Sequence, residues 1–216
     1  FLLPTVNPDG FAAKRRANAN GRDLNRDFPD QFDHPVMPDD FPSRQPETAA
    51  VMRWSRSVNA TAALNFHEGA LVANYPWDGT SDKKTRYAES LDDAAFRRLA
   101  RAYADAHPTM RDSAEFEGGV TNGARWYPLR GGVQDWHYVQ TGTMALTIET
   151  NDDKWPDEAL LRRLWREHRP AVFAFFDAGV RRTLRGTVVA GRGAAERPVP
   201  GASLAIQGQG LPFAAN

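Results

Sequence analysis

The chain has 216 residues, 41% of them hydrophobic, and its 27 Lys and Arg residues balance its 27 Asp and Glu residues. Such a chain can bury one sizeable core, and its neutral net charge offers no basic surface of the kind that binds nucleic acid. No apolar run approaches the roughly 20 residues of a membrane-spanning helix, and the absence of cysteine excludes disulfides, thiolate metal sites and cysteine nucleophiles. We therefore expect a soluble globular protein with no nucleic-acid partner and no membrane span.

The first residues have the pattern of the interior of a domain. Residues 1–3, Phe-Leu-Leu, have the composition of a buried strand and run directly into an Asn-Pro-Asp-Gly turn at residues 7–10. After residue 179, apolar residues alternate with polar ones between glycines and prolines, which predicts β-strands of a separate unit. Because about 35 residues cannot close a β-sandwich, we expect the chain to be truncated at both ends.

Between these ends, helices and strands alternate. The hydrophobic pattern predicts helices over 47–58, 92–106 and 157–179, the last interrupted near Pro170, and buried strands over 60–66 and 143–149. This alternation indicates an α/β fold. Two long stretches, 68–90 and 111–142, are rich in Gly, Trp, Tyr and Pro, and we expect them to be irregular functional loops.

Polar residues at the strand ends and in these loops are the candidates for chemistry. His67 directly follows one predicted strand, Glu149 ends another, Tyr138 lies in the stretch GGVQDWHYVQTG, and arginines crowd residues 15–26. Taken singly, each has an ordinary explanation. A strand-end histidine or glutamate can bind a neighbour or face water, a loop tyrosine can pack, and arginines can form a charged patch.

Taken together and in order, six sequence blocks resemble the zinc metallocarboxypeptidases, specifically the subfamily of carboxypeptidases D, E, M and N. The blocks are NPDGF, RRANANGRDLNRDFP, QPETAAVMRW, NFHEGALVANYPWD, GGVQDWHY and TIET. The resemblance implies an α/β fold in which helices sandwich a mixed, mostly parallel sheet. It also implies a peptidase domain at 1–179, truncated at its N-terminus, and the start of a transthyretin-like β-sandwich at 180–216, truncated at its C-terminus.

The resemblance assigns roles in substrate recognition. Asn25 and Arg26 match the clamp for the free α-carboxylate of the substrate, which a planar guanidinium fits. Arg16, nine positions before Asn25, falls where the family places the arginine that stabilises the oxyanion. Tyr138 matches the mobile tyrosine that closes over the bound residue. Asp78 matches the acid in the pocket for the C-terminal side chain, and its charge favours Lys or Arg.

The resemblance also implies a zinc site. His67 matches the third zinc ligand, and Glu149 matches the glutamate that takes the proton of the attacking water. Glu68 stands where animal members usually have glycine, and we expect it to be exposed. The other two ligands belong to a His-x-x-Glu motif that none of the five histidines of this chain forms. A catalytic zinc needs three protein ligands, so we expect the other two upstream of residue 1 and the chain alone to be inactive.

The implied function is zinc-dependent hydrolysis of the C-terminal residue of peptides or proteins, with a preference for Lys or Arg, in a secreted or periplasmic protein. One alternative is a catalytically silent relative that binds peptide ends. The joint presence of Glu149, Tyr138, Arg16 and His67 argues against it, because a silent domain needs no general base. A second alternative is a structural or adhesion module in which the β-rich tail is the working part.

Overall fold

The computed structural model describes residues 1–33, 43–181, 188–199, 203–204 and 213–214. The centre of this described part is a four-stranded sheet in the order β1-β4-β2-β3. Its strands are β1 (Ala62–His67), β2 (Ala70–Tyr75), β3 (Val120–Asn122) and β4 (Met144–Asn151). The β4 strand runs parallel to β1 and antiparallel to β2, whereas β3 runs parallel to β2. Two of these three pairings are parallel, so the expected mixed, mostly parallel sheet is confirmed.

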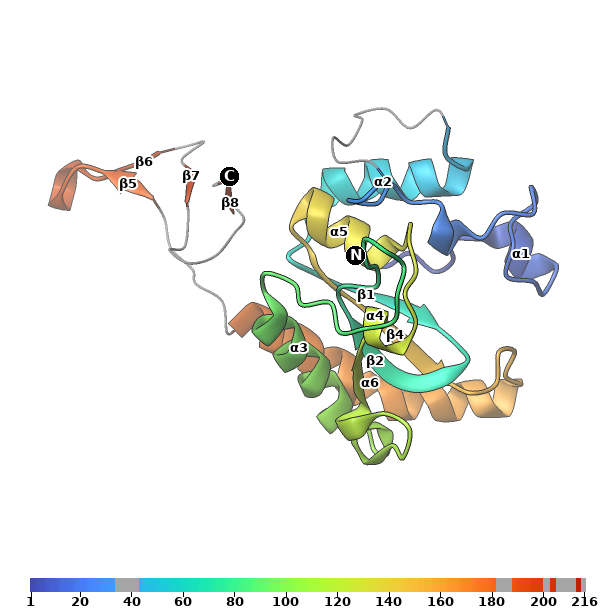
Figure 1. The fold of residues 1–216 in the computed structure, drawn as a ribbon. Helices are drawn as coiled ribbons and strands as arrows, with labels where there is room; N and C mark the ends of the chain where they lie inside the picture. Colours follow the sequence, from blue (N-terminus) through green and yellow to red (C-terminus); the bar gives the residue numbers. More distant parts are fainter. Residues whose placement is uncertain (34–42, 182–187, 200–202, 205–212, 215–216) are drawn as a thin grey trace.

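Helices cover both faces of this sheet, with α2 and α5 on one side and α3 and α6 on the other (Figure 1). The longer helices are α2 (Pro46–Val58), α3 (Asp93–Ala106), α5 (Val133–Thr141) and α6 (Glu158–Arg181). The short helical segments are α1 (Pro8–Ala12), α4 (Gly123–Trp126), η1 (Leu24–Arg26), η2 (Met110–Asp112), η3 (Glu117–Gly119) and η4 (Gly193–Ala195). This sandwich of helices around a sheet confirms the expected α/β architecture.

The larger core lies between the sheet and the pair of helices α3 and α6. The α3 residues Phe96, Leu99 and Tyr103 recur at helical spacing and are at most 3% exposed, so α3 turns one apolar face inward. They pack in one buried cluster with Phe175 of α6 and Ile148 of β4. Burial of an aliphatic or aromatic side chain contributes about 1.5–3 kcal/mol. This cluster therefore fixes β4, the strand that carries Glu149.

A second, smaller core joins α2 to α5. Met52 of α2 and Trp136 of α5 are buried and pack with Phe28, which follows the arginine-rich stretch. The ring centroids of Phe28 and Trp136 lie 5.5 Å apart. This core therefore ties the loop around residues 25–28 to the helical layer above the sheet.

The strand predicted at residues 1–3 is not formed. Phe1 and Leu2 are 98% and 86% exposed, and none of the described strands pairs with this segment. The main-chain groups of a strand need hydrogen-bonded neighbours, which an apolar composition does not itself provide. The Asn-Pro-Asp-Gly turn that follows is the start of α1, because Asn7 Oδ1 accepts a hydrogen bond from the Gly10 main-chain N–H at 2.9 Å.

The α6 helix runs through Pro170 without the predicted interruption. A proline inside a helix costs about 3 kcal/mol, because it removes a hydrogen bond and crowds the preceding turn. Beyond it, however, Ala171 and Phe175 are completely buried in the larger core. Packing of this second half of the helix offsets the local cost.

Five elements lie wholly within the two stretches, 68–90 and 111–142, that the sequence predicts to be irregular. They are β2, η3, β3, α4 and α5. The β2 strand is buried along most of its length, so it lacks the alternation that marks a half-exposed strand. The α5 helix buries the polar residues Gln134 and Asp135, so its hydrophobic period is interrupted.

After α6, the described residues form two antiparallel pairs. The pairs are β5 (Val189–Ala190) with β6 (Arg197–Pro198), and β7 (Ser203–Leu204) with β8 (Phe213–Ala214). Extended structure thus occurs in the part of the chain where the sequence predicts strands. The boundary at residue 179 and the transthyretin-like sandwich remain predictions. Across the described ranges, none of the helices combines the length and apolarity required to span a bilayer.

Candidate active site

The sheet brings two of the predicted site residues together. His67 is the last residue of β1, and in the parallel pairing its register partner on β4 is Glu149. The hydroxyl of Thr150, the next residue on β4, donates a hydrogen bond to the His67 carbonyl oxygen at 3.2 Å. The ends of two neighbouring strands are thereby held side by side, which is where an open α/β sheet carries its chemistry.

His67 is held as a neutral imidazole. Its Nε2 lies 3.0 Å from Asn65 Nδ2 on the same strand. Burial lowers the pKa of His67 to about 4, and the positive charge of Arg16 acts in the same direction. A neutral imidazole is the form that binds a metal ion, so His67 fits the role of a zinc ligand. Among the residues that the structure describes, no group of three or more His, Cys, Asp or Glu side chains could hold a metal ion.

Glu149 is a buried carboxylate with a free oxygen. It is only 7% exposed, and its Oε2 has no hydrogen-bond partner within the described chain. Burial raises the pKa of Glu149 to about 7, the negative charge of Glu68 adds to the rise, and the positive charge of Arg16 opposes it. A carboxyl group that titrates near neutral pH is suited to take up and release a proton during catalysis.

Glu68 is exposed, as expected from the sequence, although partial burial of its carboxyl group raises its pKa. Its effect on the pKa of Glu149 shows that it lies within electrostatic reach of that carboxylate. Glu68 is therefore part of the surroundings of the site.

The arginine-rich stretch is organised around Asp23. Arg16 Nε donates to Asp23 Oδ2 at 2.8 Å, and the main-chain N–H of Asn25 donates to Asp23 Oδ1 at 3.0 Å. One carboxylate thus links the predicted oxyanion arginine to the predicted carboxylate clamp. The Arg16 side chain is still 56% exposed, and its charge influences the pKa of both His67 and Glu149. Arg16 therefore belongs to the same site as the strand-end pair.

The clamp residues are placed by contacts with the loop before α5. Asn25 Oδ1 accepts a hydrogen bond from the Val133 N–H at 2.9 Å, and the exposed Arg26 bonds through Nη1 to the Asn25 carbonyl oxygen at 2.7 Å. Gly131 has φ +71°, and a Cβ atom there would lie 2.5 Å from the Arg26 carbonyl oxygen. Only glycine permits this close approach, so Gly131 is required where the two loops meet.

Asp78 lies on the floor of the same region and is 2% exposed. Its Oδ1 accepts hydrogen bonds from Asn74 Nδ2 at 2.8 Å and from Gln134 Nε2 at 3.1 Å. Burial raises the pKa of Asp78, while the Asn74 hydrogen bond and the positive charge of Arg26 lower it. The main-chain N–H of Asp78 donates to Asp135 Oδ1 at 3.0 Å, which fixes the backbone that carries the acid.

Two glycines lie close against the Asp78 carboxylate. A Cβ atom on Gly123 would lie 1.9 Å from Asp78 Oδ1 and 2.9 Å from Asn74 Oδ1. A Cβ atom on Gly132 would lie 3.3 Å from Asp78 Oδ2 and 3.7 Å from Asn25 Oδ1. Asn74 Oδ1 is buried and has no hydrogen-bond partner in the part of the chain that the structure describes. The oxygens of Asp78 and Asn74, which can accept hydrogen bonds, therefore lie next to Gly123 and Gly132. A larger side chain at either glycine would crowd them.

Tyr138 is not brought to this site, which corrects the role predicted for it. It is 2% exposed, and its hydroxyl donates to Asp92 Oδ2 at 2.6 Å. Its ring packs against Phe96 and Trp77, with centroid distances of 4.9 and 5.1 Å. The turn of α5 directs this side chain into the larger core, where burial and the Asp92 hydrogen bond raise its pKa. A residue fixed in this way cannot close over a substrate.

Tyr127 is the tyrosine on which the charges of the predicted site residues act. It directly follows α4 and is 42% exposed. Burial raises its pKa, and the charges of Glu149, Arg26, Asp78 and Arg16 also act on it. One tyrosine thus lies within electrostatic reach of four of the predicted site residues. In the sequence, Tyr127 directly precedes the Pro-Leu-Arg-Gly-Gly loop. That loop contacts Asn25 and Arg26.

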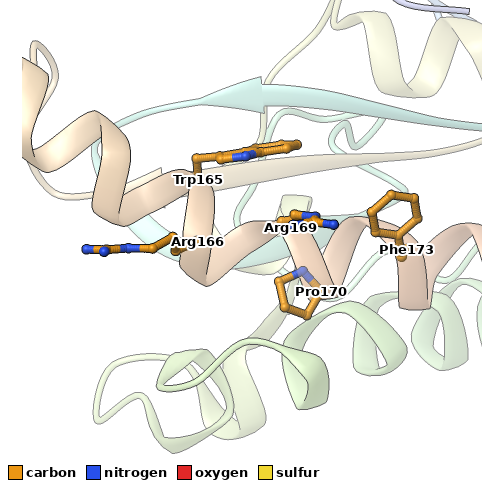
Figure 2. Close-up of a pocket in the computed structure, with 5 residues that line it drawn as sticks. All are labelled: Trp165, Arg166, Arg169, Pro170 and Phe173. Carbon is orange, nitrogen blue, oxygen red and sulfur yellow. The ribbon is translucent and has the colours of Figure 1, made fainter.

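A separate hollow lies on the exposed side of α6 (Figure 2). It is lined by Trp165, Arg166, Arg169, Pro170 and Phe173. Trp165 and Phe173 are 60% and 63% exposed. These residues include none of those gathered at the strand ends, so the hollow is distinct from the candidate active site.

The chain is similar to known proteins over most of its length. The family model described as "Zinc carboxypeptidase" matches residues 1–171. The chain is 48% identical over 187 residues to carboxypeptidase SOL1 of Arabidopsis thaliana, covering 87% of this chain and 38% of the relative. It is 40% identical over 216 residues to carboxypeptidase E of Caenorhabditis elegans, covering 81% and 46%. It is 37% identical over 224 residues to the human carboxypeptidase N catalytic chain, covering 87% and 49%.

Solved structures show the same fold at lower identity. Bovine thrombin-activatable fibrinolysis inhibitor, in complex with tick carboxypeptidase inhibitor, matches with a TM-score of 0.65 at 20% identity, over 83% of this chain and 69% of that chain. Carboxypeptidase A from Helicoverpa armigera matches with a TM-score of 0.63 at 16% identity, over 83% and 51%. The chain spans less than half the length of the three curated relatives. From the family match and these identities, we conclude that the chain belongs to the zinc carboxypeptidase family.

Proposed function

We propose that the protein is a zinc-dependent metallocarboxypeptidase that removes the C-terminal residue of peptides or proteins, with a preference for Lys and Arg. The observation that carries this proposal is the pairing of His67 with Glu149 at the ends of β1 and β4. A neutral imidazole and a carboxylate with a free oxygen lie side by side, within reach of the charge of Arg16.

Recognition of a chain terminus is assigned to Asn25 and Arg26. The Arg26 guanidinium is exposed and bonded to the Asn25 carbonyl oxygen through Nη1, which leaves other N–H groups of the fork to bind a carboxylate. Charge-assisted hydrogen bonds contribute roughly 1.5–3 kcal/mol each. Loss of the terminal charge therefore weakens binding by enough to distinguish a free C-terminus from an internal peptide bond.

Hydrolysis is divided among three residues of this chain. Zinc, when bound, activates the attacking water and polarises the scissile carbonyl, and His67 supplies one neutral ligand for it. Glu149 accepts the proton of the attacking water at its free oxygen and passes it to the leaving amine nitrogen. Arg16 offers its guanidinium to the negative charge that develops on the carbonyl oxygen.

The preference for basic side chains rests on Asp78 and Asn74. A cationic side chain that enters beside Gly123 and Gly132 would meet the Asp78 carboxylate and the unpartnered Asn74 Oδ1. Two acceptors of this kind suit a Lys ammonium or an Arg guanidinium, which only donate hydrogen bonds. An apolar side chain would leave the buried Asn74 Oδ1 without a hydrogen bond, at a cost of about 1–3 kcal/mol, and would leave the Asp78 carboxylate without a cation.

Tyr127 is assigned the role of the tyrosine that closes over the bound C-terminal residue. It is exposed, and the charges of both Glu149 and Asp78 act on its pKa. We further propose residues 1–179 as the peptidase domain and 180–216 as the start of a transthyretin-like sandwich. The short antiparallel pairs after α6 support this division. A secreted or periplasmic location is proposed from the similarity to carboxypeptidases E and N.

The proposal is tested by incubating the full-length protein, loaded with zinc, with matched peptides that end in Arg or Leu, each with a free or an amidated C-terminus. We expect release of the terminal residue from the free peptides only, and faster release of Arg than of Leu. Release from amidated peptides would contradict terminal recognition. Tight binding of the free Arg peptide without any release would identify a catalytically silent, peptide-binding relative.

A further inference from the structure

His168 is a buried residue of α6 with hydrogen bonds at both ring nitrogens. It is 5% exposed. Its Nε2 lies 2.9 Å from the main-chain oxygen of Thr150, and its Nδ1 lies 2.9 Å from the hydroxyl of Tyr103. The polarity of these bonds is fixed, because a carbonyl oxygen can only accept. Nε2 therefore carries the proton, and Nδ1 accepts the proton of the Tyr103 hydroxyl.

The surroundings keep both side chains in these roles. Burial lowers the pKa of His168 and raises the pKa of Tyr103, so the imidazole stays neutral and the phenol stays protonated at neutral pH. The His107 ring packs against the His168 ring in a tilted arrangement, with a centroid distance of 4.3 Å. The chain from Tyr103 through His168 to Thr150 is thus a directional series of hydrogen bonds that starts in α3 and ends on β4.

Thr150 connects this series to the strand-end pair. It follows Glu149 directly in β4, and its hydroxyl donates to the His67 carbonyl oxygen at 3.2 Å. One residue thus holds the main chain of His67 and is joined covalently to Glu149. Its own carbonyl is held from the far side by His168.

We propose that His168, together with Tyr103, is a positioning residue that sets the relative placement of Glu149 and His67 through the Thr150 backbone. The inference rests on the proposed function, because it assigns these residues a purpose in hydrolysis. It gives a reason for a buried imidazole on α6, next to the positions where Ala171 and Phe175 pack in the larger core.

The dependence on the backbone follows from the state of the Glu149 carboxylate. Its Oε2 makes no hydrogen bond within the described residues, so that oxygen has no side-chain partner to aim it. The main chain at residues 149 and 150 sets the point from which this side chain extends, so a shift of that main chain moves the carboxylate. A displacement of about 1 Å at a reacting group can cost on the order of 10²-fold in rate.

The test compares three variants of the full-length, zinc-loaded protein. His168→Phe keeps a ring in the interface but removes both hydrogen bonds. His168→Gln keeps one donor and one acceptor on an amide. Phe175→Leu is the matched control, because it weakens the same helix interface at a fully buried position whose ring makes no hydrogen bond to Thr150. For each, kcat, KM and the thermal midpoint are measured with a peptide ending in Arg, well below the midpoint.

We expect His168→Phe to lower kcat by about 10–100-fold with KM within about twofold, as for groups that orient a catalytic site from behind. His168→Gln should recover most of this loss. Phe175→Leu should lower the thermal midpoint and leave kcat near that of the unsubstituted protein. If His168→Phe and Phe175→Leu lower the midpoint alike and both leave kcat unchanged, His168 is only structural and the proposal fails.

A readout that needs no activity separates this proposal from the proposed function. In the unsubstituted protein, ¹⁵N spectra should show His168 as the Nε2–H tautomer. His168→Phe should then shift the side-chain resonances of His67 and Glu149, whereas Phe175→Leu should not. If the protein has no peptidase activity but these shifts are still observed, the proposed function is wrong, while the placement of His67 and Glu149 by His168 is supported. Unshifted resonances in His168→Phe would overturn the positioning itself.

Discussion

His67 and Glu149 are register partners in the parallel pair of β1 and β4, so they lie side by side where both strands end. One is a neutral imidazole, and the other is a buried carboxylate with an oxygen that no described residue binds. Burial of an unpaired carboxylate costs free energy, so this arrangement does not stabilise the fold. It suits chemistry instead, because it places a metal ligand next to a group that can accept a proton.

The Asp78 carboxylate should decide which C-terminal residues are removed. Asp78→Ala leaves a buried cation of the substrate without its partner, which costs about 3–5 kcal/mol. We therefore expect kcat/KM for peptides ending in Arg or Lys to fall by on the order of 10²-fold or more, and kcat/KM for peptides ending in Leu to change much less. The measurement is kcat/KM for a matched pair of peptides that differ only in the last residue.

Asp82→Ala is the control for this substitution. Asp82 lies four positions further along the chain, is exposed and pairs with Arg86. Its loss should leave the ratio between the two peptides unchanged. Equal losses on Arg and Leu peptides in Asp78→Ala would show that Asp78 supports the fold of the pocket and does not select the substrate.

The two tyrosines should separate stability from turnover. Tyr138→Phe removes the hydroxyl that donates to Asp92 in the core, so it should lower the free energy of unfolding by about 1–3 kcal/mol and leave kcat/KM nearly unchanged. Tyr127→Phe removes the hydroxyl of a tyrosine that is 42% exposed, so it should lower kcat/KM and leave the free energy of unfolding within about 0.5 kcal/mol. Urea unfolding and steady-state kinetics on both variants check this, and the reverse pattern would restore Tyr138 to the site.

The helix layer is more readily predicted from the sequence than the site is. The α3 helix follows from Phe96, Leu99 and Tyr103, which recur at a spacing that only a helix places on one face. The sequence also allows the closeness of His67 and Glu149 to be predicted, because both residues stand at the ends of short apolar runs. Parallel strands of one sheet bring such ends together.

The remaining features depend on contacts that a linear pattern does not contain. The α5 helix buries Gln134 and Asp135, which are satisfied by hydrogen bonds to Asp78, Gly79 and Thr147. The buried face of α5 therefore mixes polar and apolar residues, and the sequence does not show the apolar spacing of a helix there. The same helix directs Tyr138 into the core, where its hydroxyl donates to Asp92, and the match of this residue to the mobile tyrosine of the family does not contain that contact.

His107 should make stability depend on pH. Burial lowers its pKa from 6.5 to about 4 in the folded chain, so the unfolded chain binds more protons between these two values. Its contribution is therefore complete above about pH 6.5 and is lost as the pH falls toward 4, with a limiting slope of about 1.4 kcal/mol per pH unit.

Comparison with His107→Asn isolates this contribution from the buried carboxyl groups, whose raised pKa values act in the opposite direction over the same range. The substituted amide does not titrate, yet its oxygen can still accept from the Met110 N–H, which the imidazole binds at 3.1 Å. Urea unfolding at pH 7, 6, 5 and 4 should show the unsubstituted chain losing stability relative to the variant. A difference that does not change with pH would mean that His107 has the same pKa in the folded and the unfolded chain.

The most direct test of the account is Glu149→Gln in the full-length, zinc-loaded protein. Glutamine keeps the size of the side chain and much of its hydrogen bonding but cannot accept the proton of the attacking water. General-base catalysis is typically worth about 10²–10⁴-fold, so kcat should fall by at least that factor while zinc content and KM, which depends on Asn25, Arg26 and Asp78, change little. A Glu149→Gln variant with full zinc content and near-normal kcat would contradict the assignment of the general base to Glu149.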